Sequence, residues 1–495
     1  MKSVKLESLF DINFLSEVKI SPDGKHIAFV QSKGSVEENK YFSHIWLYSF
    51  VDSSVKELTA TGTERSFIWL DNENIAFANA RTDKERDMAQ KGMPYTTFYK
   101  ININGGEALK LFTIPLKAAE LTKLDNGEFL FSSVYDNYGP DFLNMDDSEK
   151  EKAVKKAAED NASFKIVDEI PFWQNGQGVT NKKRKRLYIF NPETKDVKVI
   201  SDALLNVGTM SVSGNLIAFA GVEFENKMVQ VAKVFVHDIT KGETKYIDLG
   251  DEYNVHNVEL FGDKIMFIGV RTSESNSYRN PEMFFVQLSG GKAEPFVNLD
   301  QSFGGGIGSD CKYGGGQTFV TQKDYFYYIS ARGASSFLFK LCQKGNETML
   351  SPGVTGSVDA FDIKGDVCAY IAVRDKGLQE LYTLDLSTGT EKRLTFLNAD
   401  WLKEHSVSYP EYFTMINRDG TELDCWIIKP VGYDPNKKYP AILDMHGGPK
   451  AIYGDSLFHE MQVWDNEGYF VFFTNPRGSD GKGSEFANII GDRYL

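Results

Sequence analysis

The chain has 495 residues, of which 41% are hydrophobic and 25% charged, a composition typical of a globular protein long enough for about three domains. Its net charge of −14 argues against nucleic-acid binding, because contacts to a phosphate backbone need a basic face. The four cysteines show no Cys-x-x-Cys spacing, so neither a zinc site nor a disulfide framework is expected. We therefore expect no metal, no cofactor and no nucleic-acid partner.

The first twenty residues, MKSVKLESLFDINFLSEVKI, carry charges every few positions and offer no apolar core for a signal peptide. No run of the sequence approaches the length of apolar residues that a membrane span needs. These features predict a cytoplasmic protein that does not enter a membrane.

A repeated pattern fills residues 15–404, after an N-terminal segment of residues 1–14. In each copy a polar turn leads into a short apolar strand, which a partner strand follows. The apolar strands are Ser21–Val30, Leu70–Ala80, Leu124–Val134, Val212–Val222, Phe261–Val270, Lys323–Ala331 and Lys364–Val373. Most copies lie about 42–60 residues apart, which is the period of a four-stranded propeller blade. The repeat predicts an all-β, seven-bladed propeller.

The third and fourth copies are separated by a longer gap of roughly 88 residues, which indicates an insertion. Its first part, Asp146–Asp160, is rich in Ala, Lys and Glu and predicts a solvated surface helix. Its second part, Asp168–Gly178, places Phe172 and Trp173 beside acidic residues on a loop. Loops of this kind often carry a binding function. The alternative is that the carboxylates are solvated and the aromatic groups only hold the loop in place.

Three other sequence features resemble binding motifs but are better explained as parts of the fold. The run NKKRKR at Asn181–Arg186 directly precedes a strand in an acidic protein, which favours a solvated hairpin end over a nucleic-acid patch. His459-Glu460 is not followed by a second histidine at the spacing of a zinc helix. The glycine clusters at 304–308 and 314–316 match no phosphate-binding motif and predict loops between propeller strands.

A different pattern begins near residue 405. Two antiparallel strands are predicted first, at Glu411–Asn417 and Glu422–Pro430. An apolar strand (Ala441–Met445), a glycine-rich turn (His446–Pro449), a helix (Ser456–Asn466), a second apolar strand (Tyr469–Thr474) and a polar turn (Asn475–Gly483) then follow. This order is typical of an α/β fold. Because glycine lets the backbone approach closely, a strand that runs into His-Gly-Gly suits a loop that presents an N–H group to a developing negative charge.

The motifs His446-Gly447-Gly448-Pro449 and Asn475-Pro476-Arg477-Gly478-Ser479, at this separation, resemble the prolyl oligopeptidase family of serine peptidases. The similarity is greatest to its acylaminoacyl-peptidase and dipeptidyl-peptidase branches. The resemblance implies a propeller over residues 15–404 and the first part of an α/β-hydrolase domain over residues 405–495. It also implies Ser-His-Asp acyl transfer on short peptide substrates, near their amino terminus. In that fold the first four strands lie in the order first, second, fourth, third.

The resemblance implies roles for five residues. Gly448 is the candidate oxyanion-hole donor through its N–H, the alternative being a merely tight turn. His446 is expected to brace the loop, since the catalytic histidine of this fold follows the nucleophile. Arg477 either orients the loop near the nucleophile or forms a structural ion pair. Asp168 and Glu169 are candidates to hold the amino terminus of a substrate.

The nucleophile motif of the family is missing from residues 1–495. No serine has glycine two positions before and two positions after it, and the nearest case, Ser479, is preceded by Arg477. We therefore expect a C-terminally truncated copy of a peptidase that is inactive by itself. The alternative is a non-catalytic propeller that binds a partner and keeps a vestigial hydrolase part. The coding DNA after codon 495 distinguishes the two.

Overall fold

A computed structural model describes residues 1–274, 278–350, 355–448 and 450–493. The chain divides into two compact units, which we call the first unit (residues 1–66, 276–281 and 299–495) and the second unit (residues 67–275 and 282–298). Pro449 of the His-Gly-Gly-Pro motif lies outside the described residues. Within the described part of the chain, no helix is long and apolar enough to cross a membrane.

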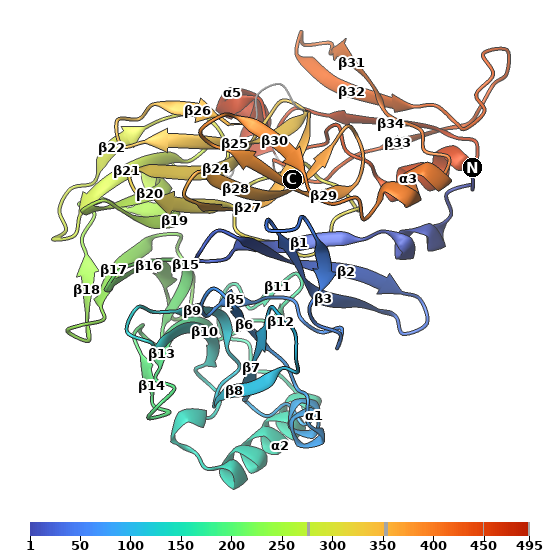
Figure 1. Cartoon of the computed structure of the whole chain (residues 1–495). Helices are drawn as coiled ribbons and strands as arrows, with labels where there is room; N and C mark the ends of the chain where they lie inside the picture. The colour runs from blue at the N-terminus through green and yellow to red at the C-terminus, as the bar shows by residue number, and fades with distance from the viewer. Residues whose placement is uncertain (275–277, 351–354, 449, 494–495) are drawn as a thin grey trace. The chain divides into compact units, whose positions relative to one another are not determined.

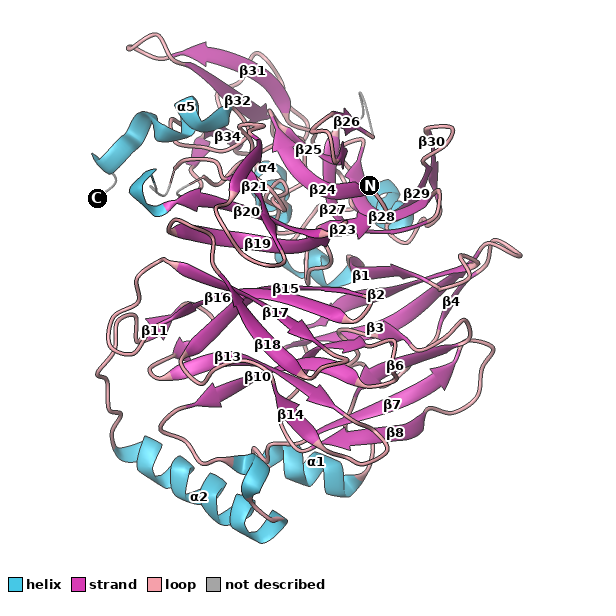
Figure 2. Cartoon of the chain, turned by 90° about the vertical axis from the view of Figure 1, so that its left-hand side faces the viewer, coloured by secondary structure: helices cyan, strands magenta, loops and turns pink. Residues whose placement is uncertain are grey.

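The repeat folds as four-stranded antiparallel sheets, seven of them among the described residues, which we number in chain order. Four sheets lie in the second unit (Figure 2). The second sheet is formed by β5 (Ile68–Trp69), β6 (Asn74–Ala78), β7 (Thr96–Asn102) and β8 (Leu109–Ile114), and the third by β9 (Ala119–Lys123), β10 (Phe129–Asp136), β13 (Lys183–Phe190) and β14 (Val197–Val199). The fourth is formed by β15 (Leu205–Ser213), β16 (Leu216–Glu223), β17 (Ala232–Asp238) and β18 (Glu243–Ile247), and the fifth by β19 (Tyr253–Phe261), β20 (Lys264–Arg271), β21 (Glu282–Gln287) and β22 (Glu294–Val297).

The other three repeat sheets lie in the first unit. The first sheet is formed by β1 (Phe14–Ile20), β2 (His26–Ser35), β3 (Lys40–Ser49) and β4 (Val55–Glu57). The sixth is formed by β23 (Phe319–Gln322), β24 (Tyr325–Arg332), β25 (Ser335–Cys342) and β26 (Glu347–Met349), and the seventh by β27 (Gly356–Lys364), β28 (Val367–Arg374), β29 (Gln379–Asp385) and β30 (Thr390–Arg393).

Neighbouring sheets within each unit share apolar cores. In the second unit, side chains of the second and third, third and fourth, and fourth and fifth sheets form three clusters. In the first unit, the sixth sheet packs on the seventh, and the seventh packs on the first through Leu15, Ile371 and Leu381. The third, fourth and seventh sheets therefore pack against a neighbouring sheet on both faces, as propeller blades do.

The insertion in the third sheet contains the predicted helix, α2 (Asp147–Ser163), after the short 3-10 helix η2 (Phe142–Asn144). The Asp146 side chain caps α2, and Glu149 completes the capping box. A two-stranded sheet follows, formed by β11 (Trp173–Gln174) and β12 (Gly178–Val179). Beside α2 lies α1 (Asp83–Gln90), which our sequence analysis missed although Thr82 and Glu85 form a capping box at its start (Figure 2). The remaining short helix of this unit is η3 (Thr272–Glu274).

The last sheet of the first unit has the order β31 (Glu411–Ile416), β32 (Glu422–Ile428), β34 (Phe470–Asn475), β33 (Ala441–Asp444) (Figure 1). This is the predicted order of first, second, fourth and third strands. β33 pairs with β34 in parallel, and no further strand adjoins β33 among the described residues. α4 (His459–Asn466) packs on this sheet through Met461, against Trp426 and Phe473. α5 (Gly483–Ala487) and η4 (Asn488–Arg493) follow β34.

The helix α4 begins at His459, three residues after the predicted start. Residues before it are held in an extended form instead, because the Ser309 hydroxyl donates to the carbonyl oxygen of Leu457 at 2.6 Å. The carboxylate oxygens of Asp310 accept the N–H groups of His459 and Glu460 at 2.7 and 2.8 Å. Asp310, which is distant in sequence, therefore acts as the cap of α4.

The N-terminal residues of the chain are fastened to residues near position 400. Backbone N–H groups of Lys2 and Asn13 donate to the carbonyl oxygen of Glu404 at 2.7 Å and to the Asn398 side chain at 2.8 Å. The 3-10 helix η1 (Leu6–Asp11) lies between these contacts, and α3 (Ala399–Glu404) supplies Trp401 to the apolar cluster beneath it. This arrangement closes the first unit around its N-terminal segment.

Candidate functional site

Two loops meet at one edge of the last sheet. The loop that begins with His446 follows β33, and the loop that begins at Asn475 follows β34 (Figure 1). Because β33 and β34 are parallel, their carboxyl ends lie at the same edge, where α/β folds place their active sites. The two motifs found in the sequence are thereby brought together.

His446 and Ser479 connect the two loops directly. Nε2 of His446 lies 3.1 Å from the hydroxyl oxygen of Ser479. Nδ1 of His446 lies 2.7 Å from the carbonyl oxygen of Gly447, which can only accept, so Nδ1 carries a proton. Ser479 is only 1% exposed and also contacts the carbonyl oxygen of Pro476 at 2.7 Å. A substrate carbonyl therefore cannot reach this serine, and the pair serves as a brace.

Asn475 ties the loops together at a second point. Its side chain accepts from the N–H of Tyr453 at 2.8 Å and donates to the carbonyl oxygen of Tyr453 at 2.9 Å. The Tyr453 hydroxyl donates to Asp444 at the end of β33, at 2.7 Å, and burial together with this carboxylate raises the pKa of Tyr453. Two backbone bonds, from Lys450 N–H to Gly478 and from Asp480 N–H to Ala451, complete the connection.

Gly448 is exposed in the middle of the first loop. Within the described residues, no acceptor is bonded to its N–H group, whereas the segments on either side are bonded to the second loop. Gly478 in the second loop has φ +93, and a Cβ atom there would lie 2.5 Å from the Ile490 side chain. The second loop therefore requires glycine for its fold, whereas in the first loop the N–H group of Gly448 has no bonded acceptor among the described residues.

Arg477 forms the ion pair that was one of its two predicted roles. Its Nη1 atom lies 2.5 Å from Asp419, at the turn between β31 and β32. Both side chains are more than one third exposed, so the pair contributes little to stability. The contact holds the second loop against the hairpin.

Lys450 is a residue of this site that our sequence analysis missed. Its ammonium group is hydrogen-bonded to the side-chain oxygen of Asn280. Burial lowers the pKa of Lys450, although Asp480 and Asp300 oppose this effect. Burial alone would raise the pKa of Asp300, but hydrogen bonds from Ser484 and Asn280 outweigh it and lower the pKa. The sequence around Lys450 does not indicate a role for it, because its partners Asn280 and Asp300 lie 170 and 150 residues earlier in the chain.

Asp168 and Glu169 lie in the second unit and have different surroundings. Glu169 is 2% exposed, and its carboxylate accepts from Arg184 at 2.5 and 3.0 Å and from the N–H of Lys182 at 3.1 Å. Asp168 has a 41% exposed side chain and is hydrogen-bonded to Tyr138 and Asn181. Its pKa is lowered, first by the Tyr138 hydroxyl. No cluster of potential metal ligands occurs in the part of the chain that the structure describes.

Comparison with known proteins extends the resemblance beyond the two motifs. No protein-family model matches the sequence. A Bacillus subtilis protein named uncharacterized peptidase YuxL is 25% identical over 507 aligned residues, which cover 100% of this chain and 74% of that protein. Dipeptidyl-peptidase 5 of Porphyromonas gingivalis is 22% identical, over 99% of this chain and 70% of that enzyme.

Among solved structures, the acylaminoacyl peptidase of Pyrococcus horikoshii superposes with a TM-score of 0.75 at 19% identity, over 99% of this chain and 69% of that one. The chain is therefore similar along its whole length to proteins named as peptidases, and it shares the fold of the acylaminoacyl peptidase. The β-propeller domain of a Pyrococcus furiosus protease also matches, with a TM-score of 0.50 over 78% of this chain. The four-stranded repeat sheets thus resemble those of a β-propeller domain.

The two bonded loops follow neighbouring strands of the last sheet. The first loop follows the third strand of this sheet in chain order, and the second follows the fourth. The side chains of Asn475, Arg477 and Ser479 each hold a different neighbour, namely Tyr453, Asp419 and His446. The second motif is therefore a scaffold for the first.

Proposed function

We propose that this chain supplies the propeller and the oxyanion loop of a serine peptidase that cleaves short peptides by acyl transfer. The observation that carries the proposal is Gly448, an exposed residue whose N–H group has no bonded acceptor among the described residues, on a loop braced from both sides at the carboxyl ends of β33 and β34. An oxyanion hole needs a rigid hydrogen-bond donor at such a place. A donor that is already in position stabilises the transition state most, because no free energy is lost in moving it during the reaction.

The same proposal includes a closed propeller. Residues 15–404 would form seven blades in a ring, and residues 405–495 would form the first part of the hydrolase domain. Support comes from the packing of the seventh sheet on the first, which joins the two ends of the repeat. A closed ring beside a hydrolase domain would limit access to short peptides.

Action near the amino terminus of the substrate is the finer part of the proposal. It is supported by the names of two similar proteins, a dipeptidyl-peptidase and an acylaminoacyl peptidase. Of the two acidic candidates, Asp168 is the better placed to meet a substrate amino group, because it is partly exposed and its lowered pKa keeps it charged. Glu169 would act indirectly by fixing the loop, since Arg184 already neutralises it.

Residues 1–495 contain no Gly-x-Ser-x-Gly sequence, so the proposal does not place the nucleophile among them. Expressed alone, they should not react with a fluorophosphonate, because covalent catalysis needs an activated nucleophile. A protein made from the coding DNA read past codon 495 should react at one serine. Stoichiometric labelling of residues 1–495, or no labelling of the longer protein, would refute the proposal.

In that longer protein, Gly448→Val tests the oxyanion role. Valine keeps the backbone N–H group, but its β-branched side chain would disturb the loop and move the donor. Loss of a donor altogether lowers turnover by about 10²–10³, which sets the upper limit of the effect. We expect kcat to fall far more than KM changes. Gly447→Ala provides the control, because a Cβ atom at Gly447 meets no atom within 4 Å. A purely binding role is not favoured, since similar proteins along the whole chain are peptidases.

A further inference from the structure

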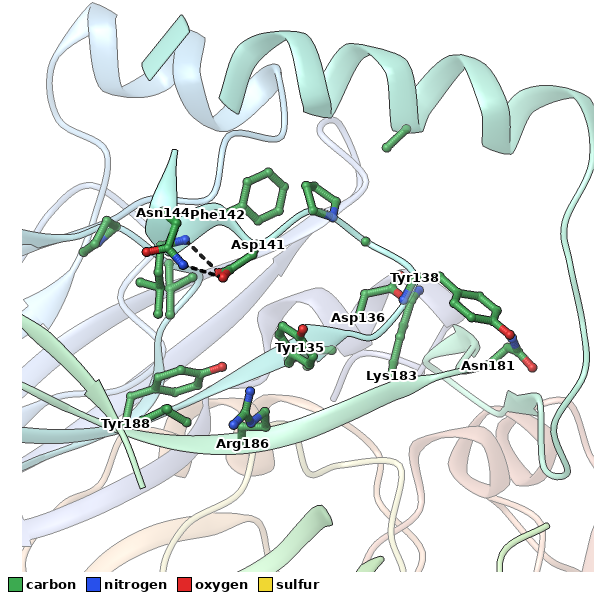
Figure 3. Close-up of a pocket in the computed structure, with 18 of the residues that line it drawn as sticks. Tyr135, Asp136, Tyr138, Asp141, Phe142, Asn144, Asn181, Lys183, Arg186 and Tyr188 are labelled. Carbon is green, nitrogen blue, oxygen red and sulfur yellow. Dashed lines mark hydrogen bonds between the residues drawn. The ribbon is translucent and has the colours of Figure 1, made fainter. Parts of the chain in front are cut away.

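A hollow of about 980 Å³ lies in the second unit between α2 and the third sheet (Figure 3). Its volume is at the upper end of the range that binds small ligands. The insertion between β10 and β13 builds it, with α2 and the segment after it on one side and β10, β13 and β14 on the other. The second sheet of this unit carries only the shorter helix α1 between β6 and β7, so the hollow is an addition made by the longer insertion of the third sheet.

The rim of the hollow is apolar and exposed. Val134, Tyr138, Phe164 and Ile166 all line it, and each is more than half exposed. Apolar side chains gathered around a concave surface indicate a binding site, whereas single exposed ones do not. Amide groups of Asn144 and Asn161 lie among them, so the wall is mixed in character.

The floor carries a fixed guanidinium group. Nε and Nη2 of Arg186 both donate to the carbonyl oxygen of Ser201, at 3.2 and 2.5 Å. The group lies over the ring of Tyr135, with 4.9 Å from Cζ to the ring centroid, and next to Tyr188 (Figure 3). Among the described residues, no carboxylate forms an ion pair with Arg186, and the Tyr188 hydroxyl is its only side-chain hydrogen-bond partner there. Arg186 is thus held in place without a carboxylate partner.

The charged side chains that line the hollow are of both signs. Asp136, Asp141, Asp160 and Asp196 line it, as do Lys165, Lys183, Lys195 and Arg186. Asp141 accepts from the Asn144 side chain at 2.6 Å and from the N–H of Leu143 at 3.3 Å (Figure 3). Asp136 accepts from the N–H of Tyr138 at 2.9 Å, and Lys183 donates to the carbonyl oxygen of Val179 at 2.9 Å. Arg186 differs from the other cations in that its guanidinium group is fixed on the floor.

We propose that this hollow binds the carboxyl end of a short apolar peptide, with the terminal carboxylate on Arg186 and the last side chains against the rim around Phe164. Arginine is suited to this because its planar fork matches a carboxylate. The mixed wall favours a peptide over a fatty acid, since the amide groups can bond to a peptide backbone. The site is built from residues of the second unit alone and requires no catalysis.

Isothermal titration of the chain of residues 1–495 tests the proposal. The probe is acetyl-Leu-Phe with a free carboxylate, compared with its carboxamide and with octanoate. We expect the carboxamide, and the free acid on Arg186→Gln, to bind at least about tenfold more weakly than the free acid on the unchanged chain. Lys185→Gln is the matched control, because Lys185 lies on the same strand but pairs with Glu120 and does not line the hollow.

A second variant guards against misfolding of Arg186→Gln. Phe164 is 64% exposed, so Phe164→Ser should fold normally and still weaken peptide binding severalfold. Amide hydrogen exchange should show protection by the peptide at residues 134–144 and 160–199. Equal affinity for acid and carboxamide, tighter binding of octanoate, protection elsewhere, or no binding up to about 10 mM peptide would each overturn the proposal.

Discussion

The imidazole of His446 and the hydroxyl group of Ser479 lie 3.1 Å apart, although 33 residues separate them in the sequence. The contact explains why the His-Gly-Gly and Asn-Pro-Arg-Gly-Ser motifs are informative together, since one holds the other in position. Ser479 and His446 therefore have a structural role, which agrees with the prediction that His446 braces the loop.

Replacing Ser479 by alanine should loosen the first loop. The substitution removes a buried hydroxyl group that contacts both His446 and Pro476, so we expect a loss of about 1–2 kcal/mol in stability. Amide hydrogen exchange at residues 446–451 should become faster. Ser148→Ala, on an exposed face of α2, is the control and should change neither quantity. Unchanged exchange in Ser479→Ala would show that Asn475 and the backbone bonds suffice.

Replacing Glu169 by glutamine should destabilise the second unit strongly. Glu169 and Arg184 both have side chains with no exposed surface, and removal of one buried charge leaves the other uncompensated. We expect a loss of about 3–5 kcal/mol in urea unfolding. The neighbouring Asp168→Asn should cost less than about 1 kcal/mol, because that side chain is 41% exposed. Similar effects for the two variants would contradict the structural role of Glu169.

Asp465 should make the first unit less stable as the pH rises. Its side chain is fully buried on α4, and burial raises its pKa from 3.8 to about 6, despite hydrogen bonds from Ser408 and Asn466. The folded protein therefore binds this proton more tightly than the unfolded chain. The resulting stabilisation is present below pH 3.8 and is lost as the pH rises through about 6.

Asp465→Asn cannot ionise and should therefore be more stable than the unchanged chain above pH 6, by about 2 kcal/mol. Near pH 4 the difference should vanish. Thermal unfolding at the two pH values measures this, with Asp400→Asn on the exposed side of α3 as the control. If Asp465→Asn is instead less stable than the unchanged chain at pH 8, the ionised carboxylate of Asp465 makes a favourable interaction in the folded protein that outweighs the cost of its burial.

Replacing Asp310 by alanine should uncap α4. Its two oxygens satisfy the N–H groups of His459 and Glu460, which have no side-chain cap of their own. Loss of such a cap costs about 1–2 kcal/mol, and Asp310→Asn should have an intermediate effect because it keeps one acceptor. Hydrogen exchange in residues 459–466 should report the change. Asp324→Ala, at an exposed turn, should leave α4 unaffected.

Periodic features of this protein could be predicted from the sequence, and contacts between distant segments could not. The seven sheets, α2 and the order of β31, β32, β34 and β33 follow from local alternation, composition and a family pattern. The shift of α4 to His459 depends on Asp310, which is 149 residues away, and no local signal reports it. The buried pair of Glu169 and Arg184 could not be predicted either, because charged residues usually lie exposed on the surface. The missed helix α1 is different, since its capping box was visible in the sequence.

The fastening of the N-terminal segment to residues near 400 has a consequence for synthesis on the ribosome. Lys2 and Asn13 precede their partners Glu404 and Asn398 by 402 and 385 residues. At typical translation rates the segment waits about 20–80 s for them. Throughout that time Val4, Ile12 and Phe14, which end up buried, are exposed to water and to other nascent chains. This segment is therefore translated long before it can fold, and it is where a chaperone that shields apolar segments would have the most to protect.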